Sequence, residues 1–183
     1  MPETETRNLH KLFQALACHD RPGDGFFENE NAGPRDAFLA IEKALSPPLK
    51  EQALDAAELD RQAFAAECLM IRLDLVLPFQ KILEVLYQRS FKDPMLPLRS
   101  LKLIHQGFQD MWEVRQLALP FEAPIVAGLL TKAYVQVLPS WFAEKGTGPE
   151  TLQAIAAGAA DVEKLLTGLT LSNIKSTMRA FWP

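Results

Sequence analysis

"CLMIRLDLVLPF", residues Cys68 to Phe79, lies within a segment that keeps a helical pattern from about Leu49 to Arg89. Apolar residues occupy nearly every side of this segment, and a helix that is apolar all round is typical of the middle of a domain. We expect one break or kink at Pro78, because a proline ring removes a backbone donor and clashes with the preceding turn. The stretch therefore predicts a long, nearly all-apolar central helix.

Helical periodicity continues on both sides of this central segment. The further helices are expected at about 3–18, 34–45, 98–117, 123–145, 149–166 and 172–181. Ser46 to Pro48 is expected to end the second helix and to begin the central one, since two prolines in succession disfavour a helix interior. The sequence contains no alternating strand pattern of useful length and no internal repeat. We therefore expect an all-α fold.

The chain of 183 residues, 48% of them hydrophobic, is long enough for one well-buried domain. The expected architecture is a single helical domain over residues 1–183, a bundle of about seven helices. An acidic, Gly-rich surface loop is expected at 20–34. A short amphipathic helix is expected at the C-terminus, within 169–183.

Charge and cysteine content exclude several functional classes. The net charge of -4 argues against nucleic acid, whose non-specific binding depends on clustered Lys and Arg. Cys18 and Cys68 form no CxxC pair, and no signal peptide is recognisable, so a reducing, cytoplasmic location is expected. The longest apolar run is interrupted by Arg72 and Asp74 and is shorter than the roughly 20 residues that span a bilayer. Membrane contact is therefore not expected.

Cys18 and His19 stand next to each other and invite the hypothesis of a redox or metal site. Neighbouring side chains on a helix diverge by about 100°, so these two groups would not pair directly. Cys18 also lies at the end of the predicted first helix, where the helix dipole disfavours a thiolate. We favour a helix end followed by a turn, with the redox or metal role as the alternative.

Four charged residues follow one another at intervals of seven in the central segment. These are Asp60, Glu67, Asp74 and Lys81. Seven residues are close to two helical turns, so the four are expected to form one narrow stripe. A stripe that faces solvent or makes salt bridges between helices is the favoured interpretation, and a carboxylate-lined metal site is the alternative. Di-iron bundles require Glu-x-x-His pairs, which this sequence lacks, so no metal is expected.

A candidate ligand pocket is suggested by "LIHQGFQDMW", in which His105, Gln109 and Trp112 share one helix face. With Phe108 and Tyr134 they could orient a small molecule in an apolar pocket. The simpler interpretation is a partly buried His105 with one hydrogen-bond partner. The sequence contains no G-x-S-x-G, Walker, GxGxxG or H-E-x-x-H motif, so neither catalytic residues nor a cofactor are predicted.

Two segments are candidates for interfaces. Small residues at Ala156, Ala159 and Ala160 would let another helix approach closely, either a second copy across a two-fold axis or a helix of the same domain. The aromatic C-terminus could dock on this domain's own core, which we favour, or fit a partner groove or a membrane surface. Its candidate residues are Met178, Phe181 and Trp182. A homodimer or a protein partner is the expectation.

The long kinked helices, the apolar interior and a last helix pair suited to dimerisation resemble the helical ligand-binding domain of TetR-type repressors. Residues 1–48 depart from that family, because a long acidic loop replaces the tight turn of a basic helix-turn-helix. The expected function is a non-enzymatic module for protein interaction or self-association. The alternative is a binding protein or sensor for an apolar small molecule between helices. An enzyme without a recognisable motif, using His105 or the charged stripe, ranks third.

Overall fold

The computed structural model describes residues 34–90, 95–115 and 121–168, and these ranges consist of helices joined by short turns, without a strand. The elements are α2 (Pro34–Asp55), α3 (Arg61–Val76), the 3-10 turn η1 (Leu77–Phe79), α4 (Gln80–Ser90), α5 (Met95–Trp112), α6 (Glu122–Glu144) and α7 (Pro149–Gly168). This confirms the all-α prediction. The helices predicted at 3–18 and 172–181, and all of the 20–34 loop except Pro34, lie outside the described residues.

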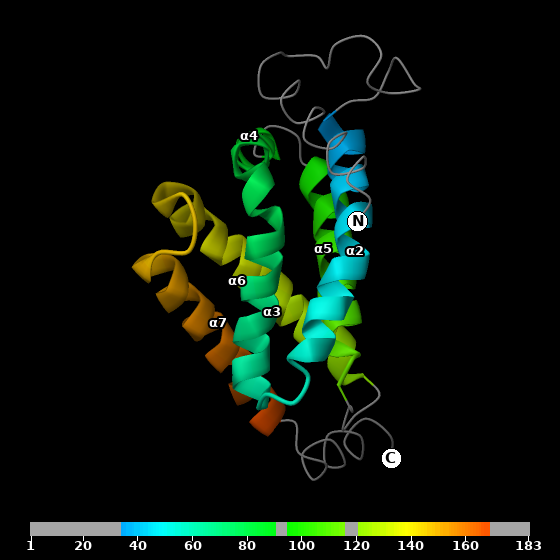
Figure 1. The fold of residues 1–183 in the computed structure, drawn as a ribbon, viewed down its shortest axis with the longest axis vertical. Helices are drawn as coiled ribbons and strands as arrows, with labels where there is room; N and C mark the ends of the chain where they lie inside the picture. The colour runs from blue at the N-terminus through cyan, green and yellow to red at the C-terminus, as the bar shows by residue number, and fades with distance from the viewer. Residues whose placement is uncertain (1–33, 91–94, 116–120, 169–183) are drawn as a thin grey trace, which may run out of the picture.

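Five helices pack as a bundle in which the neighbours close a ring (Figure 1). Helix α2 contacts α5, α5 contacts α6, α6 contacts α7, α7 contacts α3, and α3 contacts α2. Each helix thereby turns one face toward a shared interior, as layers around one hydrophobic core require. The largest fully buried apolar side chains include Trp112, Trp141, Phe64 and Phe108.

The prolines at 47 and 48 lie inside α2, which corrects the prediction that they end a helix. The helix continues to Asp55 because a row of side chains beyond them packs into the core. Leu45, Leu49 and Ala53 follow at four-residue spacing and are at most 4% exposed. Tertiary packing of such an apolar row outweighs the local cost of the prolines.

The prediction of a helical segment from Leu49 to Arg89, interrupted only at Pro78, is therefore wrong in its first part. The chain leaves α2 at Asp55 and starts α3 anew, with Asp60 as the N-cap whose carboxylate accepts a hydrogen bond of 2.8 Å from the Ala63 N–H. The second interruption does lie at Pro78, within the turn η1 that separates α3 from α4.

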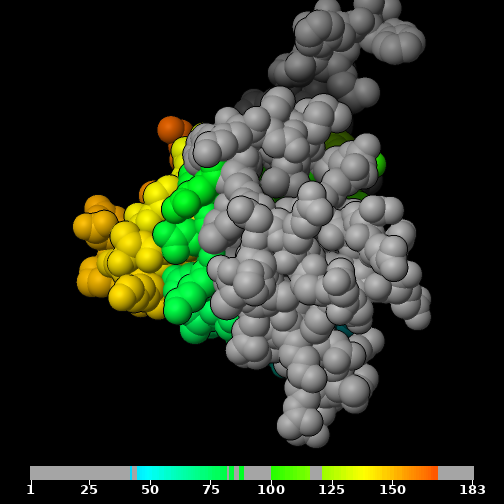
Figure 2. All heavy atoms as spheres, turned by 90° about the horizontal axis from the view of Figure 1, so that it is seen from above, coloured from blue at the N-terminus to red at the C-terminus, as the bar shows by residue number. Residues whose placement is uncertain are grey.

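The long apolar helix of the bundle is α6, which agrees with its predicted limits to within one residue at each end. Among the described residues it is also the one helix long and apolar enough to cross a membrane, although half of it is buried in the bundle. Figure 2 shows α6 in yellow on one flank, beside green atoms near the α3–α4 junction. There the Gln80 side chain donates a hydrogen bond of 2.9 Å to the Trp141 carbonyl.

The turn between α6 and α7 is closed by the Glu144 side chain. Its carboxylate accepts hydrogen bonds of 2.9 Å from the backbone N–H groups of Glu150 and Thr151, and one of 2.5 Å from the Thr151 hydroxyl. Helix α6 ends on Lys145 in the left-handed region, with φ of 55°. Glu144 thus satisfies N–H groups at the start of α7 that have no partner inside the helix.

The hydrogen bond from Thr151 and those from the backbone hold the pKa of Glu144 below its ordinary value of 4.5. A carboxyl group with a depressed folded-state pKa stabilises the fold above its unfolded-state pKa and ceases to do so on protonation. We expect Glu144→Gln to lower the melting temperature at neutral pH. The difference from the parent should shrink as the pH falls below 4.5 and vanish below the folded-state pKa. Thermal melts by circular dichroism across pH 2–7 measure this.

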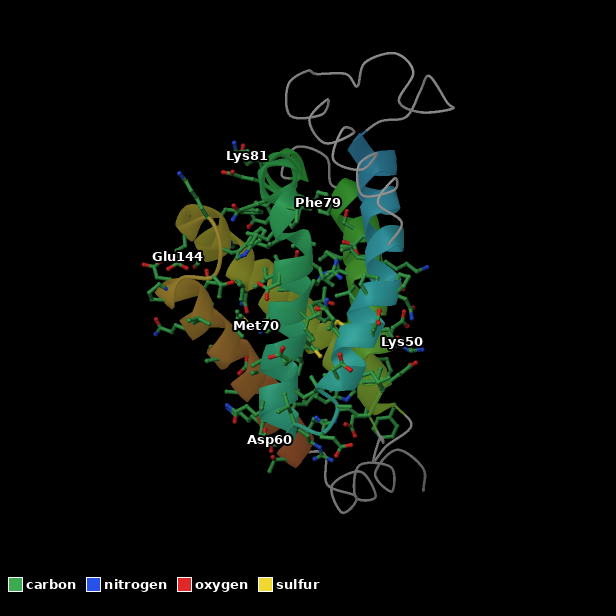
Figure 3. All side chains as sticks on the ribbon, in the orientation of Figure 1. Lys50, Asp60, Met70, Phe79, Lys81 and Glu144 are labelled. Atoms are coloured by element: carbon green, nitrogen blue, oxygen red, sulfur yellow. The ribbon has the colours of Figure 1, made fainter. Side chains whose placement is uncertain are left out.

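Glu58→Gln, which removes an exposed carboxylate close in sequence to Asp60, is the matched control for this experiment, because Asp60 and Glu144 lie far apart in Figure 3. It should leave the melting temperature nearly unchanged at every pH. A Glu144→Gln variant that melts like the control at neutral pH would show that the carboxylate does not cap α7.

Candidate functional site

A buried ion pair lies at the centre of the bundle. Arg72 of α3 has no exposed surface, and its Nη2 donates to both carboxylate oxygens of Glu42 of α2, at 2.5 and 2.6 Å. Burial alone would lower the pKa of Arg72, but the charges of Glu42 and Tyr134 and the hydrogen bonds with both together more than offset this, and the pKa is raised. Arg72 is therefore held in its charged form opposite the Glu42 carboxylate, inside a core where an unpaired charge would be very unfavourable.

Aromatic rings from two further helices enclose the guanidinium. Its central carbon lies 5.4 Å from the ring centroid of Phe108 on α5 and 5.0 Å from that of Tyr134 on α6. Burial raises the pKa of Tyr134 to about 12, with Arg72 opposing the rise. Arg72 Nε and Nη1 have no hydrogen-bond partner among the described residues. Four helices thus meet at one incompletely satisfied polar group, which is rare in a protein interior.

A cavity of about 530 Å³ lies beside this ion pair, between α2 and α5. We call it the α2/α5 cavity. Its lining consists of Glu42, Ser46, Pro47 and Leu49 from α2, and Leu103, Gln106, Gly107 and Asp110 from α5. Pro47 and Gln106 are exposed, whereas Glu42, Leu49 and Gly107 are buried, so the cavity runs from the surface toward the core.

Helical spacing brings these residues together. The α5 residues follow at intervals of three, one and three, and Glu42, Ser46 and Leu49 at four and three, so each set lies on one face of its helix. Glu42 belongs to both the cavity lining and the ion pair, and Gly107 brings the α5 wall of the cavity close to Arg72. A Cβ atom at that position would lie 3.1 Å from Arg72 Nη1 and 3.6 Å from Leu49 Cδ1. The missing side chain therefore lets α5 pass close to the guanidinium.

The five residues predicted to form a ligand pocket do not line this cavity. Phe108, Trp112 and Tyr134 are core residues, and the rings of Phe108 and Tyr134 pack edge to face with centroids 5.9 Å apart. His105 is half-buried, with Nε2 3.1 Å from the carbonyl oxygen of Pro124, and Gln109 donates to Glu113 at 2.8 Å. His105 thus has one described hydrogen-bond partner, which agrees with the simpler interpretation of this residue. It lies on a face of α5 that is directed toward α6.

The four residues of the charged stripe do not lie on one continuous helix. Asp60 precedes α3, Glu67 and Asp74 lie on it, and Lys81 lies on α4, so Figure 3 shows Asp60 and Lys81 far apart at opposite ends. Glu67 is half-buried and the other three are exposed. Within the described parts of the chain no three His, Cys, Asp or Glu side chains lie close enough to hold a metal ion.

Cys68 contributes no reactive thiol to the described site. Cys68 is buried in the core, and burial, with the nearby Glu67 charge, raises the pKa of its thiol. A thiol with a raised pKa is a poor nucleophile at neutral pH. Cys18 and His19, the pair weighed as a redox or metal site, lie outside the described residues.

The small residues of α7 divide between the interior and the surface. Gly158 and Ala159 are buried, and a Cβ at Gly158 would lie 2.5 Å from the Cβ of Ala133 on α6. Ala156 and Ala160 are exposed. Close packing within the domain therefore accounts for part of the pattern. The other interface candidates, Met178, Phe181 and Trp182, lie outside the described residues.

Sequence signals for this site are sparse. Arg72 lies three or four residues from Leu69, Cys68 and Val76, all apolar, and a charge on the apolar face of a helix was the one available indication that it is buried. Nothing local to α2 or α5 indicates that the two helices are neighbours. Comparison with protein-family models, with curated proteins and with solved structures gave no match.

Proposed function

We propose that this protein is a non-enzymatic binding protein for a small molecule, which occupies the α2/α5 cavity. The observation that carries this proposal is a cavity of about 530 Å³ that reaches from the surface to a buried carboxylate. Small-molecule sites typically measure about 300–1,000 Å³ and combine apolar walls with a few placed polar groups.

The walls have this composition. Pro47, Leu49 and Leu103 supply apolar surface for the body of a ligand. Among the described lining residues, the polar side chains are those of Glu42, Ser46, Gln106 and Asp110. These residues include no histidine, lysine or cysteine, and Glu42, the carboxylate one helical turn before Ser46, is bonded to Arg72. These groups favour binding over catalysis.

Filling the cavity tests the proposal. In Ser46→Phe an aromatic ring occupies the space between the two helices, whereas Gln52→Phe places the same ring on the exposed surface of the same helix and serves as the control. The measurement is native mass spectrometry of both variants and the parent, followed by a thermal-shift screen of small apolar and amphiphilic compounds.

We expect the parent and Gln52→Phe to bind the same compounds, and Ser46→Phe to lose at least about tenfold in affinity, which corresponds to 1.4 kcal/mol. A folded Ser46→Phe variant that binds as well as the parent would place the ligand elsewhere. A screen that finds no compound for the parent would contradict the proposal.

Self-association is a second candidate function, supported by the outer face of α7. Leu152 is 50% exposed, and Ala156 and Ala160 continue the same face at four-residue spacing. Such a flat apolar row would pack closely against the same row of a second copy across a two-fold axis. Ala156→Glu should convert a dimer to a monomer in size-exclusion chromatography with light scattering, while Gln153→Glu on the same helix should not. A monomeric parent would remove this candidate.

A further inference from the structure

The described charges that line the α2/α5 cavity are negative. Glu42 and Asp110 contribute carboxylates, one from each helix, and none of the described lining residues carries a positive charge. Glu42 is 7% exposed and Asp110 is half-buried, so both lie where the dielectric constant is lower than in water. The electrostatic interaction between these carboxylates and a charged ligand is therefore stronger than the same interaction on an open surface.

Arg72 does not reverse this balance. It is absent from the cavity lining, and its Nη2 already bonds both oxygens of Glu42. The ion pair is therefore neutral as a unit, and its positive end lies on the core side. Asp110 receives a hydrogen bond only from the neutral amide of Gln106, at 2.9 Å, among the contacts of the described residues. Asp110 forms no ion pair with any described side chain.

The hydrogen-bonding groups of the cavity lining also favour a cationic ligand over an anionic one. The two carboxylates only accept hydrogen bonds, whereas the Ser46 hydroxyl and the second N–H of Gln106 can donate. A ligand group that bonds to a carboxylate of the lining must therefore supply donors. An anionic ligand would be repelled by Asp110 and would find no cation among the described lining residues, whereas an ammonium group supplies both a positive charge and N–H donors.

We propose that the α2/α5 cavity binds an organic cation, a protonated amine whose ammonium group pairs with Asp110 beside the buried Glu42. Its apolar body contacts Leu49 and Leu103. This assignment of the ligand class rests on the proposed function. It adds a charge requirement that a purely apolar ligand would not meet.

Three compounds of similar shape separate the possibilities. They are 2-phenylethylamine, which is a cation at pH 7, the neutral 2-phenylethanol and the anion 3-phenylpropanoate. Isothermal titration calorimetry on the full chain at pH 7 and moderate salt measures their affinities. We expect the amine to bind at least about tenfold more tightly than the alcohol, as one charge-assisted hydrogen bond of about 1.5–3 kcal/mol allows, and the anion to bind most weakly.

Asp110→Asn should abolish the preference for the amine while leaving the affinity for the alcohol unchanged. Glu113→Gln is the matched control, because Gln109 and Glu113 form the same amide–carboxylate pair, four residues apart, away from the cavity lining. It should keep the preference. Circular dichroism confirms that both variants are folded, and if Asp110→Asn is not, the three compounds on the parent decide.

The two proposals fail in different ways. Equal affinity for the amine and the alcohol, both lost in Ser46→Phe, would overturn the cation assignment and leave the cavity as the binding site. Failure of all three compounds to bind would overturn both. An amine preference that survives in folded Asp110→Asn would overturn the role of Asp110.

Discussion

Arg72→Met should lower the free energy of unfolding by about 3–5 kcal/mol, the usual effect of removing one partner from a buried ion pair. The cause of the loss is the Glu42 carboxylate, which would stay in the core without the guanidinium that now bonds both of its oxygens. Domains of this size are stable by about 5–15 kcal/mol, so the variant should be close to its unfolding limit. Urea denaturation followed by circular dichroism measures the change.

The double variant Arg72→Met with Glu42→Leu distinguishes a lost contact from a stranded charge. Removing both charges relieves the desolvation penalty of the pair. It also removes the two guanidinium nitrogens that lack a hydrogen-bond partner within the described part of the chain. We therefore expect the double variant to recover most of the stability of the parent. A double variant as unstable as Arg72→Met would mean that packing around the side chain, and not charge burial, causes the loss.

Arg115→Met is the control for the aromatic contacts of Arg72. The Arg115 guanidinium lies over the rings of Phe64 and Trp112, at 4.8 and 5.7 Å, and the residue is half-buried. Its backbone-directed hydrogen bond, to the Asp60 carbonyl, is long at 3.3 Å. Losing such a contact should cost about 1 kcal/mol. If Arg72→Met were no worse than Arg115→Met, the buried pair would have no special role in stability.

The local chemistry of the chain predicted the elements with strong signals. Helices α6 and α7 have nearly their expected limits, because apolar periodicity runs through each and "EKGTGPE" separates them by a turn rich in glycine and proline. The prediction failed where tertiary packing overrides propensity. Pro47 and Pro48 remain helical because Leu49 and Ala53 are needed in the core, and no local pattern contains that information.

The α2/α5 cavity was predictable only in part. The pocket predicted from the sequence and this cavity both involve α5, but His105 and Gln109 lie on a different face of that helix from Gly107 and Asp110. Choosing the right face required knowing that α5 packs against α2, which lies some fifty residues earlier in the chain. Arg72 was treated as an interruption of an apolar run, since charged side chains are almost never fully buried unless they are paired. Its partner Glu42 lies 30 residues away on another helix.

Gly158→Ala and Gly128→Ala should differ by about 1–3 kcal/mol in their effect on stability, although the chemical change is the same. Both glycines lie inside long helices, so each substitution gains about 1 kcal/mol of helix propensity. At Gly128 no atom lies within 4 Å of the new Cβ, and the gain should be observed nearly in full. At Gly158 the new Cβ would lie 2.5 Å from the Cβ of Ala133, so α6 and α7 must move apart. Overpacking of this kind costs about 1–3 kcal/mol.

Because the propensity gain is common to both variants, their difference measures the closeness of α6 and α7. Urea denaturation of the two proteins gives it directly, and Ala133→Gly supplies the decisive control. In the double variant Gly158→Ala with Ala133→Gly, the methyl group moves from α6 to α7 and the clash disappears. We expect a favourable coupling of about 1–3 kcal/mol between these two substitutions, since they share one contact. Equal stabilisation by Gly158→Ala and Gly128→Ala, with no coupling to Ala133→Gly, would contradict close packing of the two helices.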